Sequence, residues 1–193
     1  MATKLTAFAN LSGQDLLTNS STQTMPIGSY METADGRGFR YAKNGAVATV
    51  AGKVYQSSAL DATNLQPSGG LGVSAAAIGD TSVTITTSIT LTANQLAGGY
   101  LSVDVTPGQG YLYRIAGNTA VSGAAGAIIY LEDPLIIALT ASSKVIVAKH
   151  PYDGVVIEPG TPTGVIAGVP NGVFTAAYYF WIQTHGTASV LFT

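Results

Sequence analysis

Cysteine is absent from this 193-residue chain, and charged residues make up only 9% of it. The lack of cysteine excludes a disulfide framework and any cysteine-ligated zinc or iron–sulfur site, and it fits assembly in a reducing cytoplasm. An ordinary soluble domain is about 25% charged. Because hydrophobic residues reach 47%, the shortage of charge does not indicate disorder. A folded chain of this composition must present Thr, Ser, Asn, Gly and apolar groups on its surface, which suits large, permanent contacts with other subunits.

The charge pattern favours neither nucleic acid nor a membrane as a partner. The formal net charge is −2, and the eight Lys and Arg residues are scattered rather than clustered, so no basic surface for a phosphate backbone is predicted. The N-terminal residues lack the continuous apolar region of a secretory signal. Residues 159–193 contain no Asp, Glu, Lys or Arg, but prolines and glycines interrupt them. No run of about 18 apolar residues is therefore left for a membrane helix.

Short strands separated by turns are predicted along most of the chain. The clearest one covers residues 83–91, where β-branched residues alternate with Thr and Ser at a period of two. The dipeptide Asn44-Gly45 predicts a hairpin turn between a strand around Phe39 and a return strand over residues 46–55. Further strands are predicted at residues 101–105, 111–115, 127–132, 144–149, 154–158, 173–183 and 188–192.

These strands recur about every ten residues with Gly or Pro between them, which is typical of a sandwich or barrel rather than of βαβ units. Residues 134–141 fit either a short strand or one helical turn, and no other segment shows an amphipathic helical period of useful length. We therefore predict an all-β fold, an antiparallel β-sandwich or barrel of jelly-roll-like type, with one body domain over residues 36–193.

Residues 1–35 differ from this pattern and are predicted to form an extended N-terminal arm. The part from residue 16 to residue 31 has no charge and no regular period, and it is too apolar for a solvated tail. We expect the arm to contact another subunit rather than its own β body, with a poorly ordered terminus as the alternative. The apolar side chains available for such contacts are Leu16, Leu17, Met25, Ile27, Tyr30 and Met31.

The sequence offers no recognisable catalytic or metal-binding pattern. The only two histidines, His150 and His185, each lack a second histidine at ligand spacing. Glu132 and Asp133 are adjacent, so on a strand they would point to opposite faces, and we expect them to end the predicted strand at a turn rather than to form a glycosidase site. Calcium-loop, Gly-x-Ser-x-Gly and dinucleotide motifs are missing. We therefore predict a protein that is not an enzyme and has no catalytic residues, metal or cofactor.

The main aromatic concentration is the sequence Tyr-Tyr-Phe-Trp at residues 178–181. In a strand, Tyr178 and Phe180 face one side, and Tyr179 and Trp181 face the other. One pair is expected to fill the core, and the other then needs cover from a second layer or from a neighbouring subunit. Tyr179 and Trp181 are thus candidate subunit contacts, and a carbohydrate-binding aromatic platform is the alternative.

Two stretches of the chain resemble a known group of proteins. The first is DGRGFRYAKNGA at residues 35–46, followed by AGK at 51–53, and the second runs from NGV at 171–173 to YYFWIQTHG at 178–186, with AGGYL at 97–101 and EDPL at 132–135 between them. Over roughly residues 35–190 the chain resembles the capsid decoration, or cement, proteins of tailed bacteriophages. These are small virion structural proteins that are commonly encoded near the major capsid protein.

The resemblance implies a structural protein on the capsid exterior, assembled in the host cytoplasm, that binds the major capsid protein and stabilises the shell. The low charge predicts a homo-oligomer, and the resemblance implies a homotrimer, because decoration proteins often occupy threefold sites. The arm residues, Tyr179 and Trp181 would then contact the shell or a neighbouring copy. The alternatives are a trimeric phage fibre or host-glycan-binding module, although the chain has no repeats or heptads, and a polysaccharide-degrading enzyme of the particle, although paired acids are missing.

Overall fold

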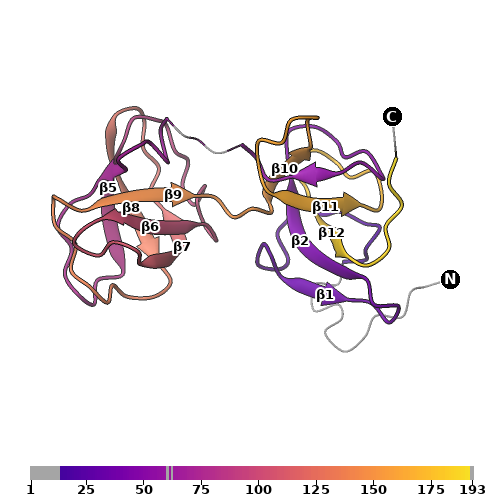
Figure 1. The fold of residues 1–193 in the computed structure, drawn as a ribbon, viewed down its shortest axis with the longest axis horizontal. Coiled ribbons are helices and arrows are strands. Elements are labelled where there is room, and N and C mark those ends of the chain that lie inside the picture. Colours follow the sequence, from indigo (N-terminus) through magenta and orange to yellow (C-terminus); the bar gives the residue numbers. More distant parts are fainter. Residues whose placement is uncertain (1–13, 60, 62, 192–193) are drawn as a thin grey trace. The chain divides into compact units, whose positions relative to one another are not determined.

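The computed structural model describes residues 14–59, 61 and 63–191, and within them the chain is all-β, without helices. These residues fall into two compact units, each with its own sheet (Figure 1). Unit 1 is made of the described residues up to Ala59 and from Pro151 onward, and unit 2 is made of those from residue 61 to His150. Unit 2 is therefore inserted between the two halves of unit 1. The sequence predicted one β body over residues 36–193, and the structure divides that stretch between two barrel-like sheets.

Unit 1 is a barrel-like sheet that closes on itself. Its strands are β1 (Tyr30–Glu32), β2 (Gly38–Asn44), β3 (Tyr55–Gln56), β10 (Asp153–Ile157), β11 (Ile166–Pro170) and β12 (Tyr179–His185). The order is β1-β2-β10-β3-β11-β12, and an additional pairing of β12 with β2 closes a ring of five strands. β1 lies outside this ring and pairs with the first half of β2. The pairing of β10 with β2 is parallel, and the others are antiparallel.

β2 and β12 form the longest pairing of unit 1 and bury side chains on both faces. Their register runs from Tyr179 opposite Lys43 to His185 opposite Gly38. Because side chains alternate along a strand, the two strands contribute to two different clusters. The inner cluster contains Ala42, Tyr55, Val155, Ala167, Phe174, Phe180 and Ile182. The outer cluster contains Leu16, Met31, Phe39, Tyr41 and Trp181.

Unit 2 is a six-stranded antiparallel sheet that is nearly closed. Its strands are β4 (Leu71–Gly72), β5 (Ser82–Thr87), β6 (Tyr100–Val105), β7 (Leu112–Asn118), β8 (Ala125–Leu131) and β9 (Lys144–Ala148), in the order β4-β9-β6-β7-β8-β5. An isolated bridge between Val73, just after β4, and Ile85 in β5 joins the two ends of this order. Its core consists entirely of residues from unit 2, with Val83, Ile85, Ile129 and Val147 among the buried members.

The prediction of an all-β fold is confirmed, and most of the predicted strands are present. The strands expected at 101–105, 111–115, 127–132, 144–149 and 154–158 correspond to β6, β7, β8, β9 and β10. The strand expected at 83–91 ends earlier, at Thr87, although Leu91 still forms a bridge with Val121. Residues 134–141 are neither a strand nor a helix, and the described part of 188–192 is not a strand. The run at 173–183 contains β12 only from Tyr179 onward.

The predicted hairpin at Asn44-Gly45 is wrong. β2 pairs with β1, β10 and β12, and residues 46–54 form no strand. The Asn44 side chain is buried and organises this corner, because its Nδ2 donates to the carbonyl oxygens of Val47 and Thr175 and its Oδ1 accepts from the Gly45 N–H. An Asn-Gly dipeptide therefore ends β2 without returning the chain along it.

None of the residues that the structure describes belongs to a helix able to cross a membrane.

Candidate functional site

The outer face of β2 and β12 carries the aromatic side chains that the sequence singled out. The rings of Tyr41 and Tyr179 are stacked, with centroids 6.0 Å apart and planes at 7°. The ring of Trp181 meets Tyr41 edge to face at 5.1 Å and 64°. Phe39, Tyr41 and Trp181 are almost fully buried. This aromatic surface is thus covered within the chain and is not an open platform for a glycan or a second subunit.

The cover comes from residues 14–28, which we call the strap. Leu16 is buried in the outer cluster, and Met25 packs against it. Met31 of β1 completes the apolar cover. The second layer that the aromatic pair requires is therefore supplied by the N-terminal part of the same chain.

Polar contacts hold the strap to two tyrosines of this face. Gln14 Oε1 accepts a hydrogen bond from the Tyr41 hydroxyl at 3.1 Å, and Gln14 Nε2 donates to the Tyr179 carbonyl oxygen at 2.8 Å. Ser20 and Tyr179 exchange two backbone hydrogen bonds of 3.0 and 2.8 Å. The backbone N–H of Thr24 donates to the Tyr41 hydroxyl at 3.2 Å. The strap is thus attached like a short, irregular extra strand.

The residues predicted to contact other subunits differ widely in exposure. Three of them are buried in unit 1, namely Leu16, Met31 and Trp181. Three are half-buried, namely Met25, Ile27 and Tyr179, and two are exposed, namely Leu17 and Tyr30. The expectation that the arm makes no contact with its own β body does not hold for residues 14–35, since Leu16 and Met31 lie in the outer cluster. Residues 1–13 of the predicted arm lie outside the described residues. Residues 14–35 contact their own β body because an apolar segment without a regular period can still lie flat across the face of a sheet.

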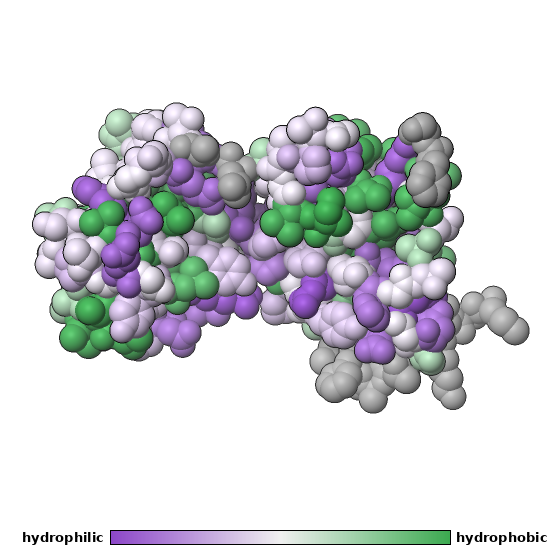
Figure 2. Space-filling model, viewed as in Figure 1, coloured by the Kyte–Doolittle hydropathy of each residue, from purple (hydrophilic) through white to green (hydrophobic). Residues whose placement is uncertain are grey.

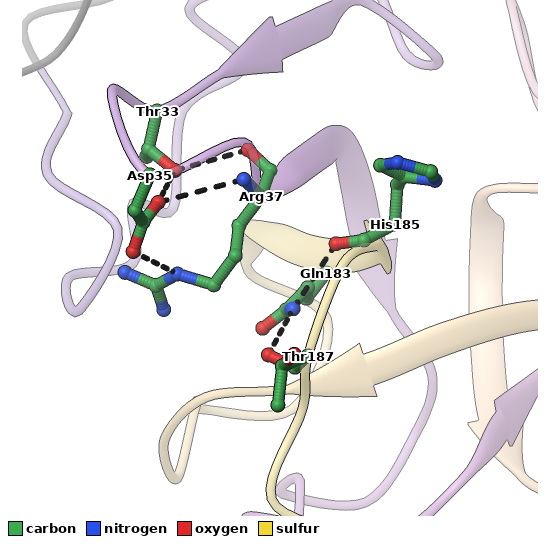
Figure 3. A network of polar contacts seen from close by, with 6 residues as sticks. All are labelled: Thr33, Asp35, Arg37, Gln183, His185 and Thr187. Atoms are coloured by element: carbon green, nitrogen blue, oxygen red, sulfur yellow. Dashed lines mark hydrogen bonds and ion pairs between the residues drawn. The ribbon is translucent and has the colours of Figure 1, made fainter.

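The turn between β1 and β2 is organised by a carboxylate. The Thr33 hydroxyl hydrogen-bonds to Asp35, and Arg37 Nε donates to Asp35 Oδ2 at 2.8 Å (Figure 3). Thr33 Oγ1 also lies 3.0 Å from the carbonyl oxygen of Arg37. The hydrogen bond from Thr33, helped by Arg37, lowers the pKa of Asp35 below its ordinary value. The DGRG sequence at residues 35–38 is therefore a structural turn.

The end of β12 packs against this turn. Gln183 Nε2 donates to the carbonyl oxygens of His185 and Thr187, at 3.1 and 2.9 Å. Gly186 has a φ of 82°, and a Cβ at this position would lie 3.1 Å from the Cα of Arg37, so only glycine fits without strain. The His185 imidazole points away from Asp35 (Figure 3). The turn at residues 35–38 and the end of β12 thus meet at a corner built for packing.

Asp35→Asn should weaken this corner at neutral pH and make unit 1 less sensitive to acid. Because the folded-state pKa of Asp35 is lowered, its contribution is present above the ordinary carboxyl pKa and is lost as the pH falls through the folded-state value. The urea midpoint of the variant should therefore lie below that of the wild type at pH 7, and the two should converge towards pH 2. Asp133→Asn, an exposed carboxylate of unit 2, is the control. An offset that stays constant with pH contradicts this role.

Of the other residues considered for catalysis or metal binding, His150 makes an aromatic contact and Glu132 an ion pair. His150 is buried, and its ring stacks on Tyr100 with centroids 6.0 Å apart. Glu132 follows the end of β8, as the sequence predicted, and its carboxylate lies 3.0 Å from Arg114 Nε. Within the described ranges, no group of three or more His, Cys, Asp and Glu residues could hold a metal ion.

Two segments of unit 1 contain no charged residues, and we call the surface that they form the uncharged face. Residues 44–52 and 159–191 contain no Asp, Glu, Lys or Arg. Backbone hydrogen bonds place these segments side by side, from Thr49 to Phe174 at 2.9 Å and from Leu191 to Gly52 at 2.8 Å. The exposed apolar side chains of this face, with 40–74% of their surface accessible, are Val47, Val50, Val165, Ile166, Val173 and Leu191.

Hydrophobic side chains gather over β10 and β11 in the same unit (Figure 2). Val156 and Ile157 of β10 add to them at one border of the uncharged face. None of the exposed aliphatic residues of this face was predicted from the sequence to be a contact. The available signal was the absence of charge after residue 159, which by itself does not tell whether a valine lies inside or outside a barrel.

The chain matches no protein-family model, no curated protein and no solved structure. The resemblance of residues 35–190 to decoration proteins stays a prediction.

Proposed function

We propose that this chain is a non-enzymatic virion structural protein of a tailed bacteriophage that binds the outside of the capsid shell and stabilises it. The observation that carries the proposal is the uncharged face of unit 1, where Val47, Val165 and Val173 are exposed by 72%, 68% and 74%. The partner is then the major capsid protein, and the copies form a homotrimer on the capsid exterior.

The uncharged face suits permanent association because its burial removes no charge from water. Each exposed aliphatic side chain contributes about 25 cal/mol per Å² of apolar surface that a partner covers. A charged group in the same place would lose its hydration and would need an exactly placed counter-charge. Contacts of this kind resemble those of obligate rather than transient interfaces.

The closed sheet of unit 1 favours contacts through side chains rather than through strand addition. Because β12 pairs with β2, the described strands of the ring leave no open edge, and the short β1 is the strand of unit 1 that has a single paired edge among the described residues. A body of this type keeps its shape while it adheres. On a shell, repeated copies that each hold several neighbours would act together, so that multivalent binding makes the whole layer hard to detach.

A glycan-binding module of a fibre is the second candidate. Exposed tyrosines favour it, namely Tyr30 in unit 1 and Tyr111 and Tyr130 in unit 2. The ring of Tyr111 stacks on that of Tyr113, with centroids 6.4 Å apart. Sugar rings bind to such aromatic faces by apolar contact.

Binding to empty shells tests the proposal directly. The purified protein should bind capsids assembled from the major capsid protein alone, and Val173→Asp should weaken this binding at least tenfold. An unpaired carboxylate in a dry interface costs several kcal/mol, and about 1.4 kcal/mol corresponds to tenfold. Ile136→Asp, at an isoleucine of unit 2 that is 63% exposed, is the matched control for an added surface charge.

Two results would contradict the proposal. One is wild-type protein that stays in solution with shells but is retained on host glycans, which favours the fibre module. The other is a Val173→Asp variant that binds shells as tightly as the wild type, which removes the uncharged face as the contact.

A further inference from the structure

The strap closes a cluster that is separate from the interior of the barrel. The inner cluster of unit 1 is built from residues of β2, β3, β10, β11 and β12 together with Phe174, and no strap residue belongs to it. The strap contributes Leu16 and Met25 only to the outer cluster. Lifting the strap would therefore uncover the outer face of β2 and β12 and leave the barrel interior closed.

The strap is held by few contacts and has little regular structure. Its only bridge is the pairing of Ser20 with Tyr179. Gln14 and Thr24 also form hydrogen bonds with the Tyr41 hydroxyl, and Gln14 donates to the Tyr179 carbonyl oxygen. Leu17, Thr18 and residues 21–24 are exposed. Segments with few buried contacts open locally at a lower free energy than the body on which they lie.

Two buried donors at the strap interface have no acceptor among the described residues. One is the indole N–H of Trp181, on the face that the strap covers, and the other is Asn19 Nδ2 in the strap itself. A buried donor without an acceptor disfavours the closed arrangement, because water satisfies the same group when it is exposed. The docked strap is thus covered but not fully hydrogen-bonded.

The turn at residues 26–29 is fixed by hydrogen bonds and lies where the strap joins the barrel. The Gly28 N–H donates to the Tyr41 carbonyl oxygen at 2.8 Å, and Arg40 Nη1 donates to the Gly28 carbonyl oxygen at 2.7 Å. Gly28 has a φ of 87°, and Ser29 bonds back to Pro26. Both the N–H and the carbonyl group of Gly28 are therefore hydrogen-bonded to β2, which fixes the chain from Gly28 onward. A hinge can form just before this point, between Met25 and Gly28.

We propose that residues 14–25 of the strap exchange between copies, so that this segment of one copy lies on the β2–β12 face of another. The occupant of the opened face is then a second copy of residues 14–25, the segment whose side chains already fit it. Because the contacts are the same within and between copies, exchange has little cost beyond bringing the copies together, which a high protein concentration supplies. A closed ring of copies leaves every aromatic face covered. The exchange goes beyond the proposed function and does not depend on a capsid.

The absence of cysteine makes a direct test possible. Ser20 and Tyr179 form a hydrogen-bonded antiparallel pair, for which the Cα atoms are about 5.5 Å apart, within the range of a disulfide. Ser20→Cys and Tyr179→Cys variants are mixed at high concentration and oxidised. Exchange predicts a covalent heterodimer on a non-reducing gel, several times stronger than the homodimer bands of each variant alone. The proposal is overturned if the mixture gives only that background while the double variant closes its disulfide entirely within monomers.

Energy transfer provides a second test that leaves Tyr179 in place. Trp181 is the only tryptophan, so wild-type copies serve as donors. The acceptor is a dansyl group on a Ser20→Cys, Trp181→Phe copy. Mixing should produce transfer that rises with concentration and exceeds severalfold the transfer to the same dansyl group on a Ser142→Cys, Trp181→Phe copy, labelled in unit 2. Equal transfer to the two labelled copies, or none to either, overturns the exchange.

Discussion

Replacement of Leu16 by Ala should destabilise unit 1 by about 2–3 kcal/mol, whereas replacement of the adjacent Leu17 should change its stability by less than about 0.5 kcal/mol. The two substitutions remove the same atoms, but Leu16 is 6% exposed in the outer cluster and Leu17 is 67% exposed. The expected loss lies at the lower end for a buried leucine, because an irregular strap can relax into the space more easily than a strand. The difference between the two variants measures the docking of the strap.

The measurement is urea unfolding followed by tryptophan fluorescence. Trp181 is the only tryptophan and lies under the strap, so its emission reports on unit 1 and on the cover at once. In Leu16→Ala the emission of the folded state should already shift to the red, and in Leu17→Ala it should not. Equal midpoints and equal spectra for the two variants would show that residues 14–28 contribute nothing to the body, as the sequence analysis expected.

The need for this cover could be predicted from the sequence, but its source could not. Alternation at residues 178–181 placed aromatic rings on both faces of one strand, and both faces of β12 are buried. The covering side chains, Leu16, Met25 and Met31, have no common period, because the strap crosses the face in an irregular conformation. Periodicity identifies regular elements that bury one face. It carries no information about a segment that lies across a sheet with single side chains inserted.

The division into two barrels could not be predicted from the sequence, for a different reason. A period of two shows which residues share a face, but it does not show which strand lies alongside. β2 closes its barrel with β12, which follows after the whole of unit 2 has been inserted. The missed strand β11 contains Gly168, with a φ of 140°, and ends in Pro170. Both residues disfavour a strand in any scheme that is based on local preference.

Composition predicted that an apolar surface exists, but it could not identify the residues of the uncharged face. A charged fraction of 9% predicted a surface with apolar groups on it, and residues 159–193 carry none of those charges. Ile166 is exposed on β11 while Ala167 beside it is buried, and Val173 is exposed in a loop beside buried Phe174. These assignments depend on the closure of the barrel, so the face could be expected but its residues could not be chosen.

Phe180→Ala should destabilise unit 1 by about 3–5 kcal/mol and should leave the unfolding of unit 2 unchanged. The Phe180 ring is fully buried in the inner cluster, with its centroid 4.6 Å from that of Phe174. Ile129→Ala is the matched variant in unit 2, where Ile129 is fully buried in the other core, and it should cost about 2–5 kcal/mol there. Since each core contains residues of its own unit only, each substitution should act on one barrel.

Hydrogen exchange resolved by peptide separates the two barrels in one experiment. In Phe180→Ala, amide protection should fall across β2, β10, β11 and β12 and persist across β5 to β9, and Ile129→Ala should give the reverse pattern. The comparison is informative because unit 2 is inserted within unit 1, so both chain ends of unit 2 stay joined to unit 1 even when unit 1 is unfolded. If both variants instead lowered protection equally in the two units, the two cores would unfold as one cooperative body, and the stability of neither could be assigned to its own side chains.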